Sequence, residues 1–190
     1  MWDPAGERNL FHDPTGTPYG MAPLMRHFLG GLLACAAELS LLVASNVNSY
    51  KRYAVASWAP VNIVWARDNR TCGFRIVGRD QALRIENRFP GADTNPYLAY
   101  AACIAAGLHG IEQAIEPGPE FKGNAYVASG VPAVPRALYE AIGAFERSAV
   151  ARRAFGDEVV EHYLTMARVE QRAYDAAVTT WERERYLERG

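Results

Sequence analysis

The chain has 190 residues, enough for one domain with a sizeable core, and its 49 % apolar and 22 % charged residues are ordinary for a globular protein. A net charge of −1 argues against a nucleic acid or a membrane surface as a partner. Three widely spaced cysteines without a CxxC pair argue against a disulfide framework or a zinc site, and favour reduced thiols in a cytoplasmic protein.

An irregular stretch precedes the first predicted helix. Prolines and glycines recur throughout residues 1–21 and predict a loop. Apolar residues then recur at helical spacing from Leu24 to Leu39, which predicts a helix that begins near Ala22 and ends near Ser45. The apolar part of this helix is too short to span a bilayer.

Strand patterns follow this helix. Apolar residues alternate with other residues over 61–65, 72–76 and 83–89, and turn residues at 68–69 and 78–80 separate the three runs. This pattern predicts two or three antiparallel strands.

The rest of the chain is predicted to be mainly helical, with helices over 97–115, 136–152 and 156–188 and a loop up to Pro135. One side of the last helix collects Val160, Leu164, Ala167, Gln171, Tyr174, Val178 and Trp181. We therefore expect an α+β fold, in which antiparallel strands form part of an active-site sheet packed against several α-helices.

Basic residues are concentrated around the predicted strands: residues 48–90 contain eight Lys or Arg against three acids. Within the last strand, Arg84, Glu86 and Arg88 alternate with apolar residues, so they should share one face at about 6–7 Å spacing. Arg75 occupies the same kind of position on the preceding strand.

This face has two interpretations. Arginine binds phosphate and carboxylate through two oxygens at once, and a glutamate suits magnesium, so the face could bind a polyanion together with a divalent cation. The same pattern is also typical of a solvated strand face with ordinary cross-strand ion pairs.

Four sequence blocks resemble the glutamine synthetase catalytic domain, in the family's order and at nearly its spacing. They are Asn48-Ser49-Tyr50-Lys51-Arg52, Asn69-Arg70-Thr71, Arg84-Ile85-Glu86-Asn87-Arg88 and Pro90-Gly91-Ala92-Asp93-Thr94-Asn95-Pro96-Tyr97-Leu98. Matches at residues 2–3, 9–11 and 107–111 extend the resemblance over essentially the whole chain.

The resemblance implies roles for five arginines. Arg52, Arg70 and Arg88 would bind the glutamate substrate, and Arg70 and Arg88 would also serve catalysis at the transferred phosphoryl group. Arg70, Arg75 and Arg84 would bind ATP.

It also implies a metal, a reaction and an assembly. Glu86 would ligate a divalent metal, Mg2+ or Mn2+, beside the ATP phosphates. ATP would phosphorylate the glutamate γ-carboxylate, and an amine would then displace the phosphate. Members of the family form homo-oligomers, which leads us to expect a dodecamer-like ring.

The chain departs from the family pattern at its beginning. The family precedes this segment with an N-terminal β domain and with further metal-binding glutamates and a His-x-His block. We therefore expect residues 1–190 to be the C-terminal portion of such a catalytic domain, a fragment without its first half. One carboxylate, Glu86, is too few for a multi-metal site, so we expect this portion to be inactive alone.

A second departure is Trp58. Ammonia-using members place a proton-accepting glutamate six residues after the arginine that Arg52 resembles, where this chain has Trp58. Tryptophan cannot accept a proton from ammonium, but it can form an apolar or cation–π wall for a larger amine. Alternatively, Trp58 packs in the core beside Pro60.

The end of the chain supports the larger amine. Residues 178–188 resemble the tail of the branch that γ-glutamylates polyamines or other alkylamines. We therefore expect a glutamate–amine ligase that favours such an amine. Two alternatives stay open: an ammonia-using glutamine synthetase, and a non-catalytic remnant that acts as an oligomer-packing or regulatory subunit.

Overall fold

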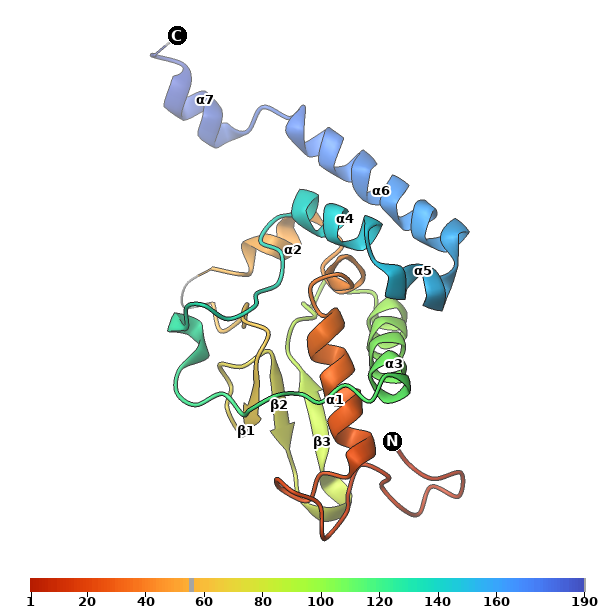
Figure 1. Cartoon of the computed structure of the whole chain (residues 1–190). Helices are drawn as coiled ribbons and strands as arrows, with labels where there is room; N and C mark the ends of the chain where they lie inside the picture. Colours follow the sequence, from red (N-terminus) through yellow and green to blue (C-terminus); the bar gives the residue numbers. More distant parts are fainter. Residues whose placement is uncertain (55–56, 190) are drawn as a thin grey trace.

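A small sheet lies against a layer of helices in the computed structural model of the protein, which describes residues 1–54 and 57–189 (Figure 1). The strands are β1 (Trp65–Arg67), β2 (Phe74–Val77) and β3 (Arg84–Asn87), in the order β1-β2-β3. The α+β fold class expected from the sequence is confirmed.

The two strand pairs differ in direction. β2 and β3 are antiparallel, as predicted, and place Arg75 opposite Glu86. β1 and β2 are parallel, so the prediction that the strands are all antiparallel is wrong for this pair. Residues 68–73, which begin with Asp68 at a left-handed φ of 50°, carry the chain back so that β2 starts beside the start of β1.

Alternation along the strands separates an apolar face from a charged face. Phe74 and Ile76 lie opposite Asn87 and Ile85 and face the helices. Arg75 and Glu86 point to the other face. The helices therefore cover one side of the sheet and leave the charged side for a site.

The helices next to the sheet are α1 (Pro23–Cys35) and α3 (Pro96–Glu112), which run side by side (Figure 1). They approach closely because glycines meet at their contact: a Cβ on Gly31 would lie 2.0 Å from the Ala106 carbonyl oxygen. α1 ends ten residues earlier than predicted, and a turn and the 3-10 helix Ser40–Leu42 replace the rest of the predicted helix.

The short helix α2 (Val47–Lys51) precedes the charged sheet segment and carries Arg52 at its end. A 3-10 turn (Asp80–Ala82) links β2 to β3, and another (Ala125–Val127) interrupts the long loop before α4.

The C-terminal helices are shorter than predicted. Two helices, α4 (Leu138–Glu146) and α5 (Ala149–Phe155), replace the single helix predicted over 136–152, because Ser148 caps a new helix start by accepting a hydrogen bond from the Ala151 amide. Residues 156–188 form α6 (Asp157–Asp175) and α7 (Thr180–Tyr186), where Thr179 and Glu182 form a capping box.

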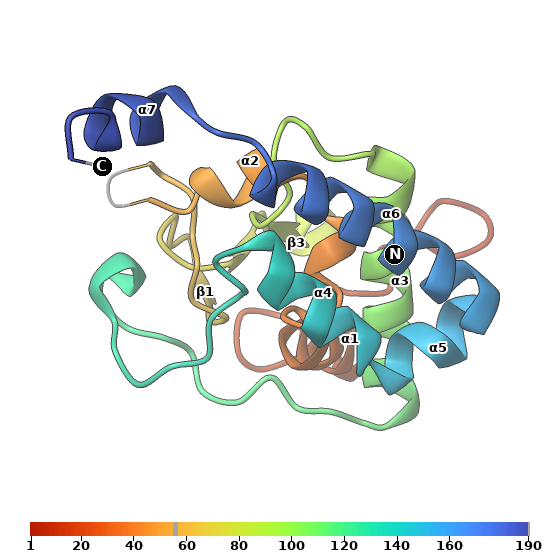
Figure 2. The same ribbon diagram turned by 90° about the horizontal axis from the view of Figure 1, so that it is seen from above.

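The predicted apolar side of the last helix is confirmed only in its first half. Val160, Leu164 and Ala167 are buried against α4, whereas Val178 and Trp181 are 74 % and 61 % exposed. Seen from above, α7 lies beyond the end of α6, at the edge of the molecule (Figure 2). Within the described residues, no helix is both long enough and apolar enough to cross a membrane.

Candidate active site

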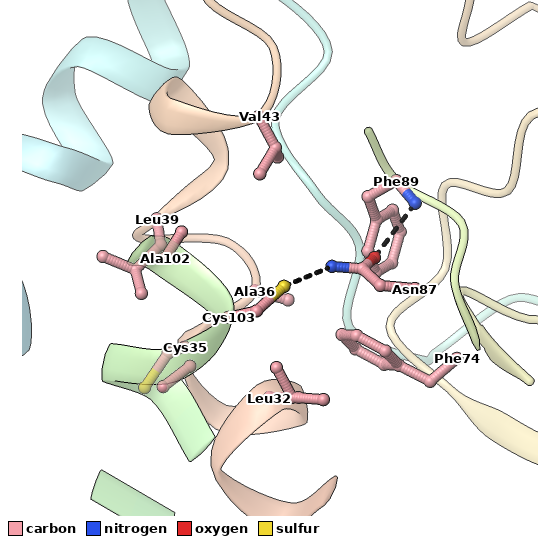
Figure 3. A pocket seen from close by; sticks show the side chains of 11 residues that line it. Leu32, Cys35, Ala36, Leu39, Val43, Phe74, Asn87, Phe89, Ala102 and Cys103 are labelled. Carbon is pink, nitrogen blue, oxygen red and sulfur yellow. Dashed lines mark hydrogen bonds between the residues drawn. The ribbon is translucent and has the colours of Figure 1, made fainter. Parts of the chain in front are cut away.

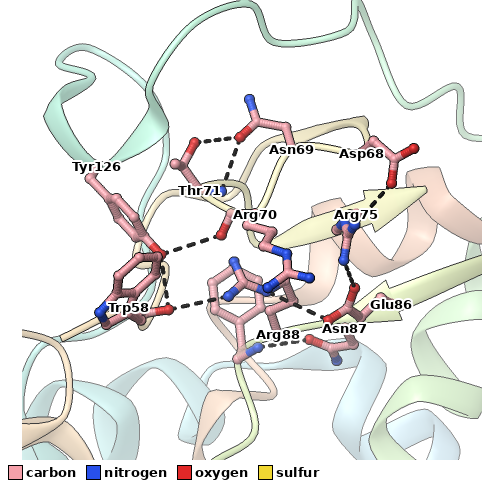
Figure 4. A network of polar contacts seen from close by, with 11 residues as sticks. Trp58, Asp68, Asn69, Arg70, Thr71, Arg75, Glu86, Asn87, Arg88 and Tyr126 are labelled. Atoms are coloured by element: carbon pink, nitrogen blue, oxygen red, sulfur yellow. Dashed lines mark hydrogen bonds and ion pairs between the residues drawn. The ribbon is translucent and has the colours of Figure 1, made fainter. Parts of the chain in front are cut away.

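The charged face of the sheet is organised around Glu86. Arg75 Nη1 lies 3.1 Å from Glu86 Oε2, and Arg88 Nε lies 3.7 Å from Glu86 Oε1 (Figure 4). Arg75 also reaches Asp68, with 2.9 Å between its Nη2 and Asp68 Oδ1. The predicted common face of Arg75, Glu86 and Arg88 is therefore present.

Both arginines keep donor capacity inside this cluster. Their side chains are only 18 % (Arg75) and 15 % (Arg88) exposed. Arg75 Nε and Arg88 Nη1 are buried and have no hydrogen-bond partner among residues 1–54 and 57–189. Buried donors are normally hydrogen-bonded, so these two unpaired N–H groups leave the cluster with donors for the oxygens of an anion.

Trp58 lies beside this cluster and is 74 % exposed, so the interpretation that it packs in the core is wrong. Its backbone has a left-handed φ of 61°, and its carbonyl oxygen accepts a hydrogen bond from Arg88 Nη2 at 3.2 Å. The same oxygen accepts a second bond, at 2.9 Å, from the hydroxyl of Tyr126.

Arg70 belongs to the loop between β1 and β2 and is exposed; its side chain extends toward Arg88 (Figure 4). The loop is fixed by Asn69, whose Oδ1 accepts hydrogen bonds from the Thr71 amide and hydroxyl at 3.0 and 2.7 Å. The Arg70 carbonyl oxygen lies 3.3 Å from the same Tyr126 hydroxyl, whose single proton is shared with the nearer Trp58 carbonyl oxygen.

Arg52 lies outside the cluster around Glu86 and contacts the residue that follows Arg88. Its guanidinium lies over the Tyr53 ring, 5.0 Å from the centroid, and donates to the Phe89 carbonyl oxygen directly after Arg88. Nearby, Ser49 Oγ donates to Asp93 Oδ2 at 2.6 Å, and this hydrogen bond lowers the pKa of the Asp93 carboxyl.

Arg84 does not join the cluster. Strand alternation places it on the face of Glu86, but it is exposed and its Nη1 donates to the Ala82 carbonyl oxygen at 3.1 Å. The structure thus brings Arg75, Glu86 and Arg88 into contact and leaves Arg84 at the start of the strand.

Glu86 fits a metal as a single oxygen ligand, since its carboxylate is half exposed and lies next to a potential anion site. In the part of the chain that the structure describes, no three His, Cys, Asp or Glu side chains lie close enough to hold a metal ion. These residues therefore supply one ligand and do not complete a metal centre.

A separate small cavity lies behind the sheet (Figure 3). It measures about 30 Å³ and is lined mostly by apolar side chains of α1, α3 and the sheet, together with Cys103 and Asn87, whose Nδ2 lies 3.3 Å from Cys103 Sγ. Burial raises the pKa of nearby Cys35 to about 12. This cavity is apolar and too small for a substrate, so the candidate site is the charged face.

Two contributors to the site were missed in the sequence. Asp68 was interpreted only as a turn residue, although it pairs with Arg75. Tyr126 lies in a stretch predicted to be a loop, 68 positions from Trp58. No local pattern marks either role: the Asp68–Arg75 contact depends on the pairing of β1 with β2, and the Tyr126–Trp58 contact depends on two loops that are far apart in the sequence.

Comparison with known proteins identifies the relatives of this chain. The family model for the glutamine synthetase catalytic domain matches residues 1–186. Gamma-glutamylethanolamide synthetase GlnA4 of Streptomyces coelicolor is 55 % identical over 90 % of this chain and 37 % of its own length. Glutamate–isopropylamine ligase of a Pseudomonas species is 45 % identical over 94 % of this chain and 39 % of its own.

Glutamine synthetase of Thermotoga maritima is more distant, at 35 % identity over 96 % of this chain and 43 % of its own length. Among solved structures, "Apo GmaS without ligand" matches with a TM-score of 0.86 at 35 % identity, over 98 % of this chain and 43 % of that one. The chain thus spans about two fifths of the length of the relatives it matches.

Proposed function

Because the chain belongs to the glutamine synthetase catalytic-domain family, we propose that it carries part of the active site of an ATP-dependent glutamate–amine ligase. The ligase joins the γ-carboxylate of glutamate to an amine through γ-glutamyl phosphate. The observation that carries this proposal is the pair of buried N–H groups on Arg75 and Arg88, beside Glu86, that have no partner among the described residues.

The arginines have a clear chemical task in this reaction. A carboxylate and ATP repel each other, and positive groups fixed between them offset that repulsion. We assign Arg70, Arg75 and Arg84 to the ATP phosphates, and Arg52, Arg70 and Arg88 to glutamate. Arg70 and Arg88 also meet the transferred phosphoryl group.

A divalent cation, Mg2+ or Mn2+, would neutralise phosphate charge when bound, with Glu86 as one of its ligands. The other ligands would come from outside the described residues. We therefore propose that residues 1–190 alone do not turn over, and that they form the C-terminal portion of a longer catalytic domain.

The proposed amine is an alkylamine or polyamine rather than ammonia. One relative is named for making γ-glutamylethanolamide and another for ligating isopropylamine to glutamate. Both names support an amine larger than ammonia. Trp58 is exposed beside Arg88, where its indole can contact alkyl carbon and a cationic head group.

We further propose a homo-oligomeric ring in the cytoplasm. Exposed apolar side chains in and next to α7, namely Val178, Trp181 and Leu187, support a subunit contact. The three cysteines are free thiols, which supports a reducing compartment.

The test is product analysis with protein made from the complete reading frame. It is incubated with ATP, Mg2+, glutamate and one amine at a time: ammonia, ethanolamine, isopropylamine or putrescine. Mass spectrometry should show a γ-glutamyl amide with an alkylamine or polyamine, together with one phosphate released per amide. Glutamine as the main product would favour the ammonia-using alternative, and no ATP-dependent product with any amine would favour the non-catalytic one.

A further inference from the structure

Tyr126 connects two loops that flank the candidate active site. Its hydroxyl lies 2.9 Å from the Trp58 carbonyl oxygen and 3.3 Å from the Arg70 carbonyl oxygen, and Figure 4 shows it between the two. The ring is half-buried, in the 3-10 turn Ala125–Val127. One phenol thus contacts the backbone of both Trp58 and the loop between β1 and β2 (residues 68–73), called the arginine loop below because it carries Arg70.

The backbone of Trp58 needs such a contact. A bulky residue with φ of 61° is in a sparsely populated conformation, which persists only where the surroundings fix it. The two hydrogen bonds to its carbonyl oxygen come from Tyr126 and from Arg88 Nη2. Because Arg88 and Tyr126 share one acceptor, the position of that acceptor helps to set where the Arg88 guanidinium lies, together with Glu86 Oε1 at 3.7 Å from Arg88 Nε.

The turn that carries Tyr126 is itself fixed to the arginine loop. Thr71 Oγ1 accepts a hydrogen bond from the Ala125 amide at 2.8 Å, and Asn69 Nδ2 donates to the Gly123 carbonyl oxygen at 2.8 Å. Asn124 Oδ1 accepts a bond from the Tyr126 amide at 3.0 Å. The hydroxyl is therefore presented from a backbone with little freedom to move.

We propose that Tyr126 is a positioning residue of the active site: its hydroxyl holds the Trp58 carbonyl oxygen in place, and through that oxygen it sets the direction of the Arg88 guanidinium. The purpose of this arrangement rests on the proposed function, since Arg88 and Trp58 are assigned there to glutamate and to the amine. The contact itself does not depend on that assignment.

The test compares Tyr126→Phe with Tyr139→Phe, a matched control. Tyr139 is 61 % exposed on α4, and its hydroxyl donates only to Glu140 at 3.3 Å among the described contacts. In 15N-labelled protein, Tyr126→Phe should shift the Arg88 Nε–H resonance and speed amide exchange at residues 57–59. Affinity for tripolyphosphate, the probe for the arginines, should fall about three- to tenfold, as expected for one lost hydrogen bond. Tyr139→Phe should leave all three measurements at wild-type values.

The inference is overturned if Tyr126→Phe leaves the Arg88 resonance and the amide exchange at residues 57–59 as they are in Tyr139→Phe. A merely structural role at the turn would loosen residues 124–127 without moving the Arg88 signal, and that result also overturns it. Failure of the proposed function is a separate result: wild-type protein would then not bind tripolyphosphate, while the Arg88 resonance would still decide the role of Tyr126.

Discussion

Arg75 and Glu86 lie directly opposite each other on antiparallel strands, with 3.1 Å between Arg75 Nη1 and Glu86 Oε2. The pair leaves Arg75 Nε buried and without a partner in the described part of the chain. A structural ion pair alone does not require that arrangement. An arginine held by a carboxylate on one edge, with a donor left on another, is suited to bind an anion.

The first prediction concerns the unpaired Arg75 Nε–H group. Arg75→Lys keeps the positive charge but removes the planar set of N–H groups, so affinity for ADP should fall at least about tenfold. The measurement is titration calorimetry. Arg79→Lys is the matched control, because Arg79 is an exposed arginine beyond the end of β2 and should tolerate the change. Equal ADP affinity in the two variants would contradict the assignment of Arg75 to phosphate.

The second prediction concerns the choice of amine in protein from the complete reading frame. An aromatic wall contributes roughly 0.5–2 kcal/mol to binding a cationic amine, which corresponds to about a two- to thirtyfold preference. Trp58→Ala should lower kcat/KM for the larger amine by about that factor. Trp58→Glu should move selectivity toward ammonia, because it restores a proton acceptor. Wild-type protein that uses ammonia as efficiently as every alkylamine tested would show that Trp58 does not set the preference.

The third prediction tests the packing of α1 on α3. An alanine Cβ at Gly31 would lie 2.0 Å from the Ala106 carbonyl oxygen, so the two helices must separate to admit it. Gly31→Ala should lower the free energy of unfolding by about 1–3 kcal/mol in urea titrations. Gly143→Ala is the control: its nearest neighbour is the movable end of Arg147 at 3.3 Å, and alanine favours helix α4. A stable Gly31→Ala variant would mean that the helices do not approach so closely.

The fourth prediction concerns how the stability of the fold changes as the pH falls. The hydrogen bond from Ser49 lowers the pKa of Asp93 in the folded protein. A lowered folded pKa stabilises the fold above the unfolded pKa, and that stabilisation is lost as the pH falls through the folded pKa. Ser49→Ala should therefore lower the urea midpoint of unfolding at pH 7. It should also make the urea midpoints at pH 7 and pH 3 differ by less than they do in the wild-type protein. An unchanged pH dependence would show that the Ser49 hydroxyl does not stabilise the Asp93 carboxylate.

Much of the site could be predicted because it depends on strand alternation. Leu83, Ile85 and Phe89 are apolar, so Glu86 and Arg88 had to face the other way, and the structure places Arg75 beside them. Arg84 obeys the same alternation in its backbone, yet its guanidinium turns to the Ala82 carbonyl oxygen. Alternation predicts the face of a residue but not the direction of a long side chain.

Other features depend on contacts that a local pattern does not contain. The parallel pairing of β1 with β2 depends on how residues 68–73 carry the chain back to the start of β1, whereas the sequence marks this connection only as a turn. The break before α5 depends on Ser148 acting as a cap within an otherwise helical pattern. Tyr126 reaches Trp58 only because the long loop before α4 folds onto the arginine loop.

The most direct test of the central claim follows the oxygen atoms of glutamate. In the proposed reaction, a γ-carboxylate oxygen attacks the γ-phosphorus of ATP, and the amine then attacks the carbonyl carbon and expels phosphate. The released phosphate keeps that carboxylate oxygen. With γ-carboxylate 18O-labelled glutamate and an alkylamine, protein from the complete reading frame should release one 18O in phosphate for each amide formed, as measured by mass spectrometry. Amide formation with unlabelled phosphate would contradict the account.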